Sequence, residues 1–369
     1  MALAGTNDLR RHTAALDAEI QGALARVARS GRFVLGAEVE AFEREFGQYC
    51  GARHCIAVAS GTDALELALR CLGVRPGQRV LTVANAGMYS TCAIRLVGAE
   101  PAFVDIDPRN LLMDPERLRE ALGSVPNVNA VIVTHLYGLV GNIAAMVEMA
   151  HSFGASVIED CAQSHGASVD GRRAGTFADL GCFSFYPTKN LGALGDAGAV
   201  TTDREDLAQS VRRLRQYGWS EKYHAVEPGG RNSRLDEMQA AVLRTKLTRL
   251  DDWNARRRSI AARYSTEIAN PRVTCPAART TDDYVAHLYV VRSAMRDGLR
   301  AHLAARHVPS DIHYPFPDYK QPAVADLFRD VVNRHAEAAC REVLTLPCFP
   351  EMTDDEVSMV VAAVNEWVD

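Results

Sequence analysis

The chain has 369 residues, and its 41 Lys and Arg against 46 Asp and Glu give a net charge of −5 at pH 7. This slightly acidic balance argues against a basic face for nucleic acid, although a local basic pocket would still accept an anionic small molecule. No apolar run approaches the roughly 18 residues of a membrane span, and the N-terminus shows no apolar segment behind its charges, so we expect a cytoplasmic protein without a membrane partner.

The first two thirds of the chain alternate between helical and strand patterns. Apolar residues recur at helical spacing in 14–29 and 38–48, and again in 143–153. Apolar runs typical of buried strands occupy 55–60, 79–84, 101–107, 130–138 and 156–163. This alternation predicts the α/β class, with a mostly parallel sheet that helices cover on both faces.

The last third has a different pattern. Residues 235–268 read as one long, uninterrupted helix rich in charge pairs, which would connect to a second domain. A strand at 287–292 and helices at 297–305 and 353–367 follow. We predict a large α/β domain over residues 1–245, with a helical N-terminal segment, and a smaller α+β domain over residues 246–369.

The nine cysteines form an odd set without a Cys-x-x-Cys pair. Four residues separate Cys50 from Cys55, but no His or Cys pair follows at zinc-site spacing. Most of the cysteines stand in apolar surroundings. We therefore expect reduced core thiols and no metal site.

A first candidate ligand site is the turn Ser60-Gly61-Thr62-Asp63, between a predicted strand and a predicted helix. Small residues let the backbone approach an anion, and a helix N-terminus offers free N–H groups and the positive end of its dipole. Such a turn also simply caps a helix, and taken alone this second interpretation is the commoner one.

A second candidate is Glu159-Asp160, at the carboxyl end of a predicted strand, with Gln163 and His165 soon after. Ligands of open α/β sheets bind beyond the carboxyl ends of the strands. A buried carboxylate there needs a cationic partner, and a protonated pyridine nitrogen is one. The alternative is that Asp160 only caps the next helix.

The third candidate is the run from Phe183 to Gly192, in which Lys189 stands among aromatics, Pro and Gly without neighbouring charges. Desolvation lowers the pKa of a lysine and makes its nucleophilic, neutral form accessible, as Schiff-base chemistry requires. Ser184, five residues earlier, is placed to offer a hydroxyl to a phosphate. The surface-lysine alternative is disfavoured by this context.

The fourth candidate lies just before the long predicted helix, in Gly230–Asp236. Arg231, Asn232 and Arg234 are donors suited to phosphate or carboxylate. Ser233 or Asp236 would also cap the helix, and both interpretations can hold together.

Together these residues resemble the DegT/DnrJ/EryC1/StrS family of sugar aminotransferases that depend on pyridoxal 5′-phosphate (PLP). The resemblance extends along nearly the whole chain, through SGTDALELAL, VGAEPAFVDID, HLYG, VIEDCAQSHGA, FSFYPTKNLGALGDAGA, GRNSRLDEMQAAVL and HLYVVR. Its most specific part is the lysine motif combined with Glu-Asp-x-x-Gln upstream. The resemblance implies the aspartate-aminotransferase-like fold, fold type I of PLP enzymes, with PLP as cofactor.

By this resemblance, Lys189 is the catalytic residue that forms the Schiff base with PLP and moves a proton between substrate and cofactor. Asp160 would keep the pyridine nitrogen protonated, which makes the ring an electron sink. Gln163 would bind the ring hydroxyl oxygen, and His165 would lie close to the ring.

The same resemblance places the cofactor phosphate on Gly61, Thr62 and Ser184. It implies that Asn232 reaches the phosphate of the neighbouring subunit's cofactor. The protein would then be a homodimer with shared active sites.

One segment departs from the family pattern. After Ala84-Asn85, family members usually carry Thr and an aromatic residue that stacks on the pyridine ring, whereas this chain has Ala86 and Gly87 there. Met88 and Tyr89 are the two candidates that would replace the missing aromatic.

Three residues are expected to contact the sugar nucleotide: Tyr186, His313 and Tyr314. Many members that act at C4 carry His at the position of Tyr186, and the Tyr form resembles enzymes that aminate C3 of dTDP-3-keto-6-deoxyhexoses. A phenol is neutral near pH 7 and donates to a sugar oxygen. The alternative is that Tyr186 only packs beside Phe185.

The predicted function is therefore amination of a nucleotide-linked keto-deoxysugar, dTDP-3-keto-6-deoxyhexose, with L-glutamate as donor, for a surface polysaccharide or secondary metabolite. The alternative substrate is a UDP- or dTDP-4-keto sugar. A non-catalytic, PLP-binding regulatory protein would lack the lysine or the carboxylate, and the dehydratase variant of the family replaces the lysine by histidine. A Rossmann oxidoreductase would need Gly-x-Gly-x-x-Gly after the first strand, which this sequence does not have.

Overall fold

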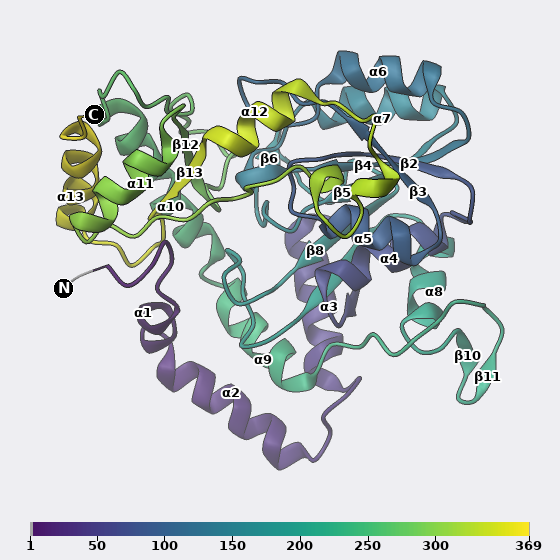
Figure 1. The fold of residues 1–369 in the computed structure, drawn as a ribbon. Helices are drawn as coiled ribbons and strands as arrows, with labels where there is room; N and C mark the ends of the chain where they lie inside the picture. The colour runs from purple at the N-terminus through teal and green to yellow at the C-terminus, as the bar shows by residue number, and fades with distance from the viewer. Residues whose placement is uncertain (1–2, 369) are drawn as a thin grey trace.

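A computed structural model describes residues 3–368 of the chain, built around a seven-stranded sheet (Figure 1). The strand order is β1-β9-β8-β5-β4-β2-β3, and β9 alone runs antiparallel to its neighbours. The strands are β1 (His54–Val58), β2 (Arg79–Val83), β3 (Glu100–Val104), β4 (Val128–Thr134), β5 (Ser156–Asp160), β8 (Leu180–Ser184) and β9 (Gly198–Thr202). The predicted α/β class with a mostly parallel sheet is confirmed.

Helices cover both faces of this sheet, also as predicted. One face carries α4 (Gly61–Cys71), α5 (Tyr89–Leu96) and α8 (Glu205–Leu214). The other face carries α3 (Ala37–Cys50), α6 (Pro115–Ser124) and α7 (Ile143–Ser152). Successive strand residues point to opposite faces, so Val80 packs with the first set of helices and Leu81 with the second. Burial of both faces explains why the strands read as continuous apolar runs.

The long helix predicted over 235–268 is wrong in one respect, because the chain forms two helices there. They are α9 (Glu237–Leu247) and α10 (Leu250–Glu267). Val242 of α9 packs against α2 (Asp17–Ser30), whereas α10 packs against α13 (Asp354–Asn365). We attribute the break to these two packing partners, because an uninterrupted helix would hold both segments on one axis.

The C-terminal third contains a second, small sheet, in which β12 (Tyr289–Arg292) pairs antiparallel with β13 (Val343–Leu346). The N-terminal segment lies against this part, since Arg11 donates to both carboxylate oxygens of Glu356 at 2.8 and 2.7 Å. The division at residue 245 stays a prediction. The remaining elements are α1 (Leu9–Ala14), α11 (Arg296–Ala305), α12 (Arg334–Glu342), the pairs β6 (Ser168–Val169) with β7 (Arg172–Arg173) and β10 (Trp219–Glu221) with β11 (His224–Ala225), and the 3-10 turns Leu136–Gly138, Asp318–Lys320 and Ala325–Leu327.

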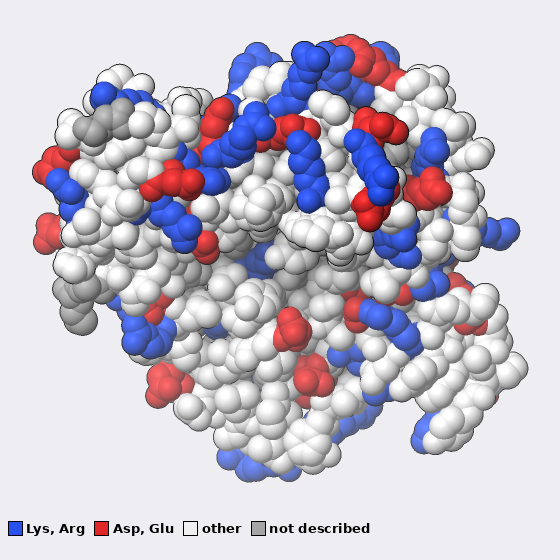
Figure 2. Space-filling view, in the orientation of Figure 1, with Lys and Arg blue, Asp and Glu red and all other residues white. Residues whose placement is uncertain are grey.

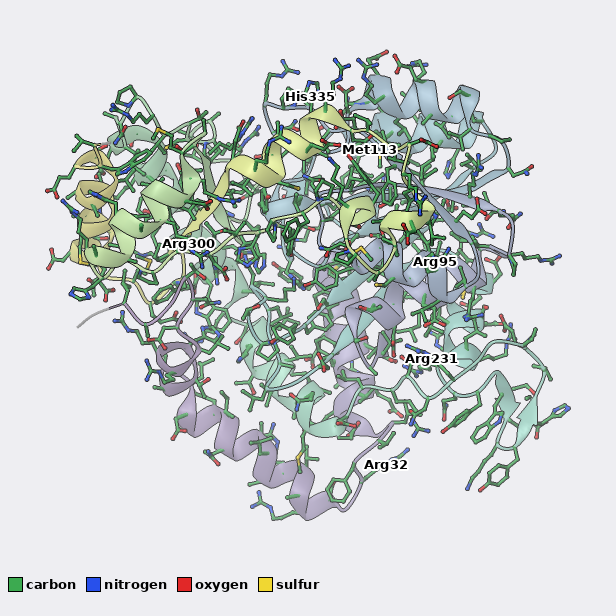
Figure 3. All side chains as sticks on the ribbon, in the orientation of Figure 1. Arg32, Arg95, Met113, Arg231, Arg300 and His335 are labelled. Atoms are coloured by element: carbon green, nitrogen blue, oxygen red, sulfur yellow. The ribbon has the colours of Figure 1, made fainter. Side chains whose placement is uncertain are left out.

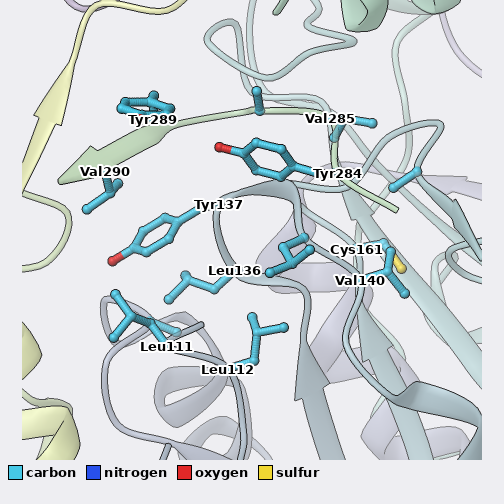
Figure 4. Close-up of a cluster of buried hydrophobic side chains, with 14 of the residues drawn as sticks. Leu111, Leu112, Leu136, Tyr137, Val140, Cys161, Tyr284, Val285, Tyr289 and Val290 are labelled. Carbon is cyan, nitrogen blue, oxygen red and sulfur yellow. The ribbon is translucent and has the colours of Figure 1, made fainter. Parts of the chain in front are cut away.

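A buried apolar cluster joins the central sheet to the C-terminal third (Figure 4). Leu136, Tyr137 and Cys161, which follow β4 and β5, pack together with Tyr284 and Val285. The backbone N–H of Val285 also donates to Gly138 at 2.9 Å. These contacts fix the C-terminal third next to the carboxyl ends of the parallel strands.

The surface carries intermingled charges. Figure 2 shows Lys and Arg close to Asp and Glu over this face, without a large patch of one sign. No helix among residues 3–368 combines the length and the hydropathy that a bilayer span requires. The expected cytoplasmic location stays a prediction.

Candidate active site

A cavity of about 620 Å³ opens beyond the carboxyl ends of the parallel strands, where α/β proteins bind ligands. Ser60 follows β1, Asp160 ends β5 and Ser184 ends β8, and all three line the cavity. Nine of the predicted site residues line it: Gly61, Thr62, Asp160, Gln163, Ser184, Tyr186, Lys189, His313 and Tyr314. Two predicted residues, His165 and Asn232, do not.

The N-terminus of α4 forms an anion cradle together with Ser184. Ser60 caps the helix by accepting a hydrogen bond from the Asp63 N–H at 3.1 Å. A Cβ on Gly61 would lie 2.5 Å from the Cβ of Ser184, so only glycine allows this close approach. The cap interpretation is confirmed. The first turn of α4 and the Ser184 hydroxyl border the same space, as an anion site requires, and that second interpretation stays a prediction.

Asp160 is a buried carboxylate that faces the cavity, with 5% of its surface exposed. It accepts hydrogen bonds from the Ala162 N–H at 3.1 Å and from the Thr134 hydroxyl at 3.4 Å. Burial raises the pKa of Asp160, and the nearby Lys189 charge opposes that effect. No ion pair to Asp160 is found within the described residues, so a ligand cation in the cavity would stabilise its charged form.

The neighbouring carboxylate, Glu159, is fully partnered on the opposite side of β5. Its oxygens accept the backbone N–H groups of Gly175, Phe177 and Ala178 at 2.7 to 3.0 Å, and Oε2 lies 3.0 Å from His135 Nε2. His135, Glu159 and Cys161 are close enough to hold a metal ion, but these hydrogen bonds already use both Glu159 oxygens. Glu159 and its hydrogen-bond partners therefore support the loop between β5 and β8.

Lys189 borders the cavity and is partly buried. Burial lowers the pKa of Lys189 to about 8, while the charge of Asp160 acts to raise it. The backbone on its N-terminal side is held by Asn7, whose side-chain amide donates to the Thr188 carbonyl at 3.2 Å. The amine therefore has an accessible neutral form and a fixed attachment point.

Gly87 has the same relation to Tyr314 that Gly61 has to Ser184. Gly87 has φ +81°, and a Cβ there would lie 2.8 Å from Cε1 of Tyr314. The Tyr314 hydroxyl accepts from Gln163 Nε2 at 3.2 Å, and its ring lies edge-on to Tyr89 with 6.1 Å between centroids. Tyr89 lines the cavity, whereas the Met88 side chain does not. Of the two candidates to replace the aromatic residue that family members carry at position 87, only Tyr89 lines the cavity.

His165 lies behind the cavity wall. It is fully buried, and its ring packs against Phe183 and Phe185 with centroids 5.6 and 5.4 Å apart. Burial, together with the Lys189 charge, lowers the pKa of His165 to about 3, so the ring is neutral. The His165 ring is therefore not open to contact with a ligand in the cavity.

Asn232 is exposed, and its two neighbours explain why. The Ser233 hydroxyl donates to Asp63 at 2.6 Å. Arg231, which Figure 3 labels, forms ion pairs with Asp63 and, at 3.2 Å, with Glu66. Residues 231 and 233 thus anchor the segment on α4 of the same chain. Asn232, between them, remains at the surface.

Asn7, Thr134 and His287 are among the polar residues of the site that sequence reasoning missed. His287 begins the HLYVVR segment, which predicts a strand and carries part of the family resemblance, but to which no site residue was assigned. The signal was present in that segment, because a histidine at the start of the predicted strand 287–292 is polar where the pattern calls for an apolar residue.

An anion cradle at a helix N-terminus, a buried carboxylate without a cation and a desolvated lysine border one cavity on this fold. These groups fit the phosphate, the protonated pyridine nitrogen and the aldehyde of PLP, and they define a PLP enzyme of fold type I. Comparison of the chain with known protein families and solved structures agrees with this assignment. Residues 14–365 match the DegT/DnrJ/EryC1/StrS aminotransferase family, and the chain belongs to that family.

Two similar proteins are curated transaminases. The dTDP-3-amino-3,4,6-trideoxy-alpha-D-glucose transaminase of Streptomyces venezuelae is 42% identical over 364 residues, which are 98% of this chain and 95% of that protein. The dTDP-3-amino-3,6-dideoxy-alpha-D-galactopyranose transaminase of Aneurinibacillus thermoaerophilus is 42% identical over 360 residues, 98% of each chain. The solved structure of S. venezuelae DesV superimposes with a TM-score of 0.92 over 98% of both chains at 42% identity. The chain is a PLP-dependent sugar-nucleotide aminotransferase.

Proposed function

We propose that the protein transfers the amino group of L-glutamate to C3 of a dTDP-3-keto-6-deoxyhexose, in the synthesis of an amino sugar for a surface polysaccharide or a secondary metabolite. The observation that carries the sugar assignment is the position of Tyr186. This side chain lines the cavity and is 52% exposed, whereas Phe185 is fully buried against Phe42 and Phe46. A phenol three residues from Lys189 is available to a sugar oxygen. The names of the two curated relatives, both 3-amino sugar transaminases, support the same assignment.

We assign the cofactor contacts as follows. Gly61, Thr62 and Ser184 hold the phosphate at the N-terminus of α4, and Asp160 holds the pyridine nitrogen in its protonated form. When bound, PLP supplies the electron sink that stabilises negative charge on the substrate carbon. A pKa of about 8 leaves Lys189 partly neutral near pH 7, so its Nζ can take up a proton and return it.

The proposed homodimer has active sites that both subunits complete. Among the described residues that line the cavity, Lys189 is the only Lys or Arg, whereas Asp160, Asp196 and Asp311 are acidic. A nucleotide diphosphate and a dicarboxylic amino donor are both anionic, so donors beyond this lining are needed. Asn232 is exposed on a segment anchored to α4, which supports its assignment to the partner's cofactor phosphate.

The sugar assignment is tested by presenting dTDP-3-keto and dTDP-4-keto 6-deoxyhexoses, together with a UDP-4-keto sugar, to the holoenzyme with L-glutamate. The product is identified by mass spectrometry and by NMR of the aminated carbon. We expect amination of the 3-keto sugar, with 2-oxoglutarate as co-product, and replacement of glutamate by aspartate or alanine tests the donor. Turnover of 4-keto sugars with none of the 3-keto sugar would contradict the assignment. A Lys189→Ala variant provides the background rate.

A further inference from the structure

A buried hydrogen-bond network begins at Asn190, the residue after Lys189. The Asn190 side chain donates from Nδ2 to the Val285 carbonyl at 3.0 Å and to Asn254 Oδ1 at 2.8 Å. Its Oδ1 lies 3.0 Å from Nδ1 of His287. The network therefore connects the lysine segment to the strand region of the C-terminal third.

The contacts fix which atom donates in each bond. A backbone carbonyl only accepts, so the end of the Asn190 amide that faces Val285 must be the NH₂ group. The other end, Oδ1, faces His287 and accepts. Nδ1 of His287 must therefore carry the hydrogen, whichever way the neighbouring amides are turned.

This tautomer leaves Nε2 of His287 as a bare acceptor. His287 lines the cavity, and the described residues give its Nε2 no hydrogen-bond partner. Nε2 is also absent from the fully enclosed polar atoms without partners, which include both ring nitrogens of His165. A buried imidazole thus presents a lone pair to the cavity that Lys189 also lines.

We propose that His287 is a positioning residue: when Lys189 is not bonded to the cofactor, the lysine side chain turns toward His287 and donates a hydrogen bond from Nζ to Nε2, a contact that is not formed in this structure. Both residues line one cavity, and Asn190 links the lysine backbone to the same imidazole. The proposal rests on the proposed role of Lys189 and is independent of the sugar.

The electrostatic surroundings are consistent with a neutral imidazole at this place. Burial lowers the pKa of His287 well below its ordinary value, and the charges of Lys189 and Arg257 act in the same direction. The other titratable groups that face the pair are His165 and His313 toward His287, and Asp160 toward Lys189. A neutral His287 accepts from an ammonium without repelling it, and the hydrogen bond favours the protonated amine.

Two substitutions at position 287 separate the two ring nitrogens. His287→Asn retains a donor near the place of Nδ1 and loses the acceptor at the cavity. His287→Gln retains an acceptor near the place of Nε2 and loses the donor that Asn190 requires. The network predicts a lower Tm for His287→Gln, and the proposal predicts a lower Lys189 pKa for His287→Asn.

The pKa of Lys189 is measured without substrate, from the rate at which the full-length, cofactor-free protein forms the Schiff base with added PLP as pH varies. Only the neutral amine reacts, so the rate follows the neutral fraction. A wild-type pKa of about 8 that falls by one pH unit in His287→Asn raises the rate at pH 7 about fivefold. His287→Gln should keep the wild-type pH profile.

Each outcome decides the proposal. An unchanged pH profile in His287→Asn would overturn it, because His287 would then only support Asn190. An equal shift in both variants would also overturn it, since the shift would follow the loss of packing rather than the acceptor. If wild-type protein forms no Schiff base at Lys189, the assigned role of Lys189 fails first, and that result is separate from the comparison of the variants.

Discussion

Replacing Gly61 by alanine tests the anion cradle directly. A Cβ at this position would lie 2.5 Å from Cβ of Ser184, 3.1 Å from its Cα and 3.2 Å from its Oγ. Carbon atoms in contact need about 3.5 to 4.0 Å, so the start of α4 and the end of β8 must separate by about an ångström. Gly61 does not have a positive φ, so the clash with Ser184 is the cause to be tested.

The expected magnitude follows from that displacement. Inserting a methyl group into a packed contact costs about 1 to 3 kcal/mol, and here the displaced atoms are the phosphate donors themselves. We therefore expect the Kd for PLP to rise by about tenfold to a hundredfold, at 1.4 kcal/mol for each factor of ten. Gly22→Ala is the matched control, because a Cβ on Gly22 of α2 meets nothing within 4 Å.

The assay is a spectroscopic PLP titration of the cofactor-free protein in four forms: wild type, Gly61→Ala, Ser184→Gly and the double variant. Ser184→Gly weakens binding by removing the hydroxyl, but it also removes the Cβ that clashes. Adding Gly61→Ala to Ser184→Gly should then cost much less than adding it to the wild type. Equal costs in both backgrounds, or no loss of affinity in Gly61→Ala, would refute the contact as the reason for glycine.

Three further predictions test the rest of the site. Borohydride reduction of the yellow holoenzyme should attach the cofactor to one peptide containing Lys189, and a label on another lysine would refute the assignment. Mixed dimers of Lys189→Ala and Asn232→Ala chains should regain part of the activity, because one of the two sites then has both groups; no recovery in a verified heterodimer would indicate self-contained sites. Tyr89→Ala should weaken PLP binding about two- to tenfold if its ring stacks on the cofactor, whereas Tyr89→Phe should bind PLP like the wild type.

Features encoded by neighbouring residues were predictable from the sequence. The strands of the central sheet are buried on both faces, so each appears as a short apolar run that needs no knowledge of its partners. Asp160 ends such a run, and Lys189 stands in an aromatic and glycine-rich loop that already indicates desolvation. The resemblance to a family then supplied roles that spacing alone does not give.

Features that depend on distant segments were not predictable in the same way. Asn7 reaches the lysine loop across 181 positions of sequence, and His287 contacts Asn190 across 97. The break after α9 likewise depends on which helices α9 and α10 pack against, and no Pro or Gly marks it in the sequence. Local sequence patterns do not indicate which distant segments a residue will contact.

The two close-packed glycines of the site show why a departure from a family pattern need not disable a site. Gly61 follows the pattern and Gly87 departs from it, yet each leaves room for one side chain from elsewhere in the chain: Ser184 in one case and Tyr314 in the other. An aromatic side chain at position 87 would require the Tyr314 ring to move, because even a Cβ comes within 2.8 Å of that ring. In this chain Tyr314 occupies the room beside Gly87, and Tyr89, which packs edge-on against Tyr314, also presents an aromatic ring to the cavity.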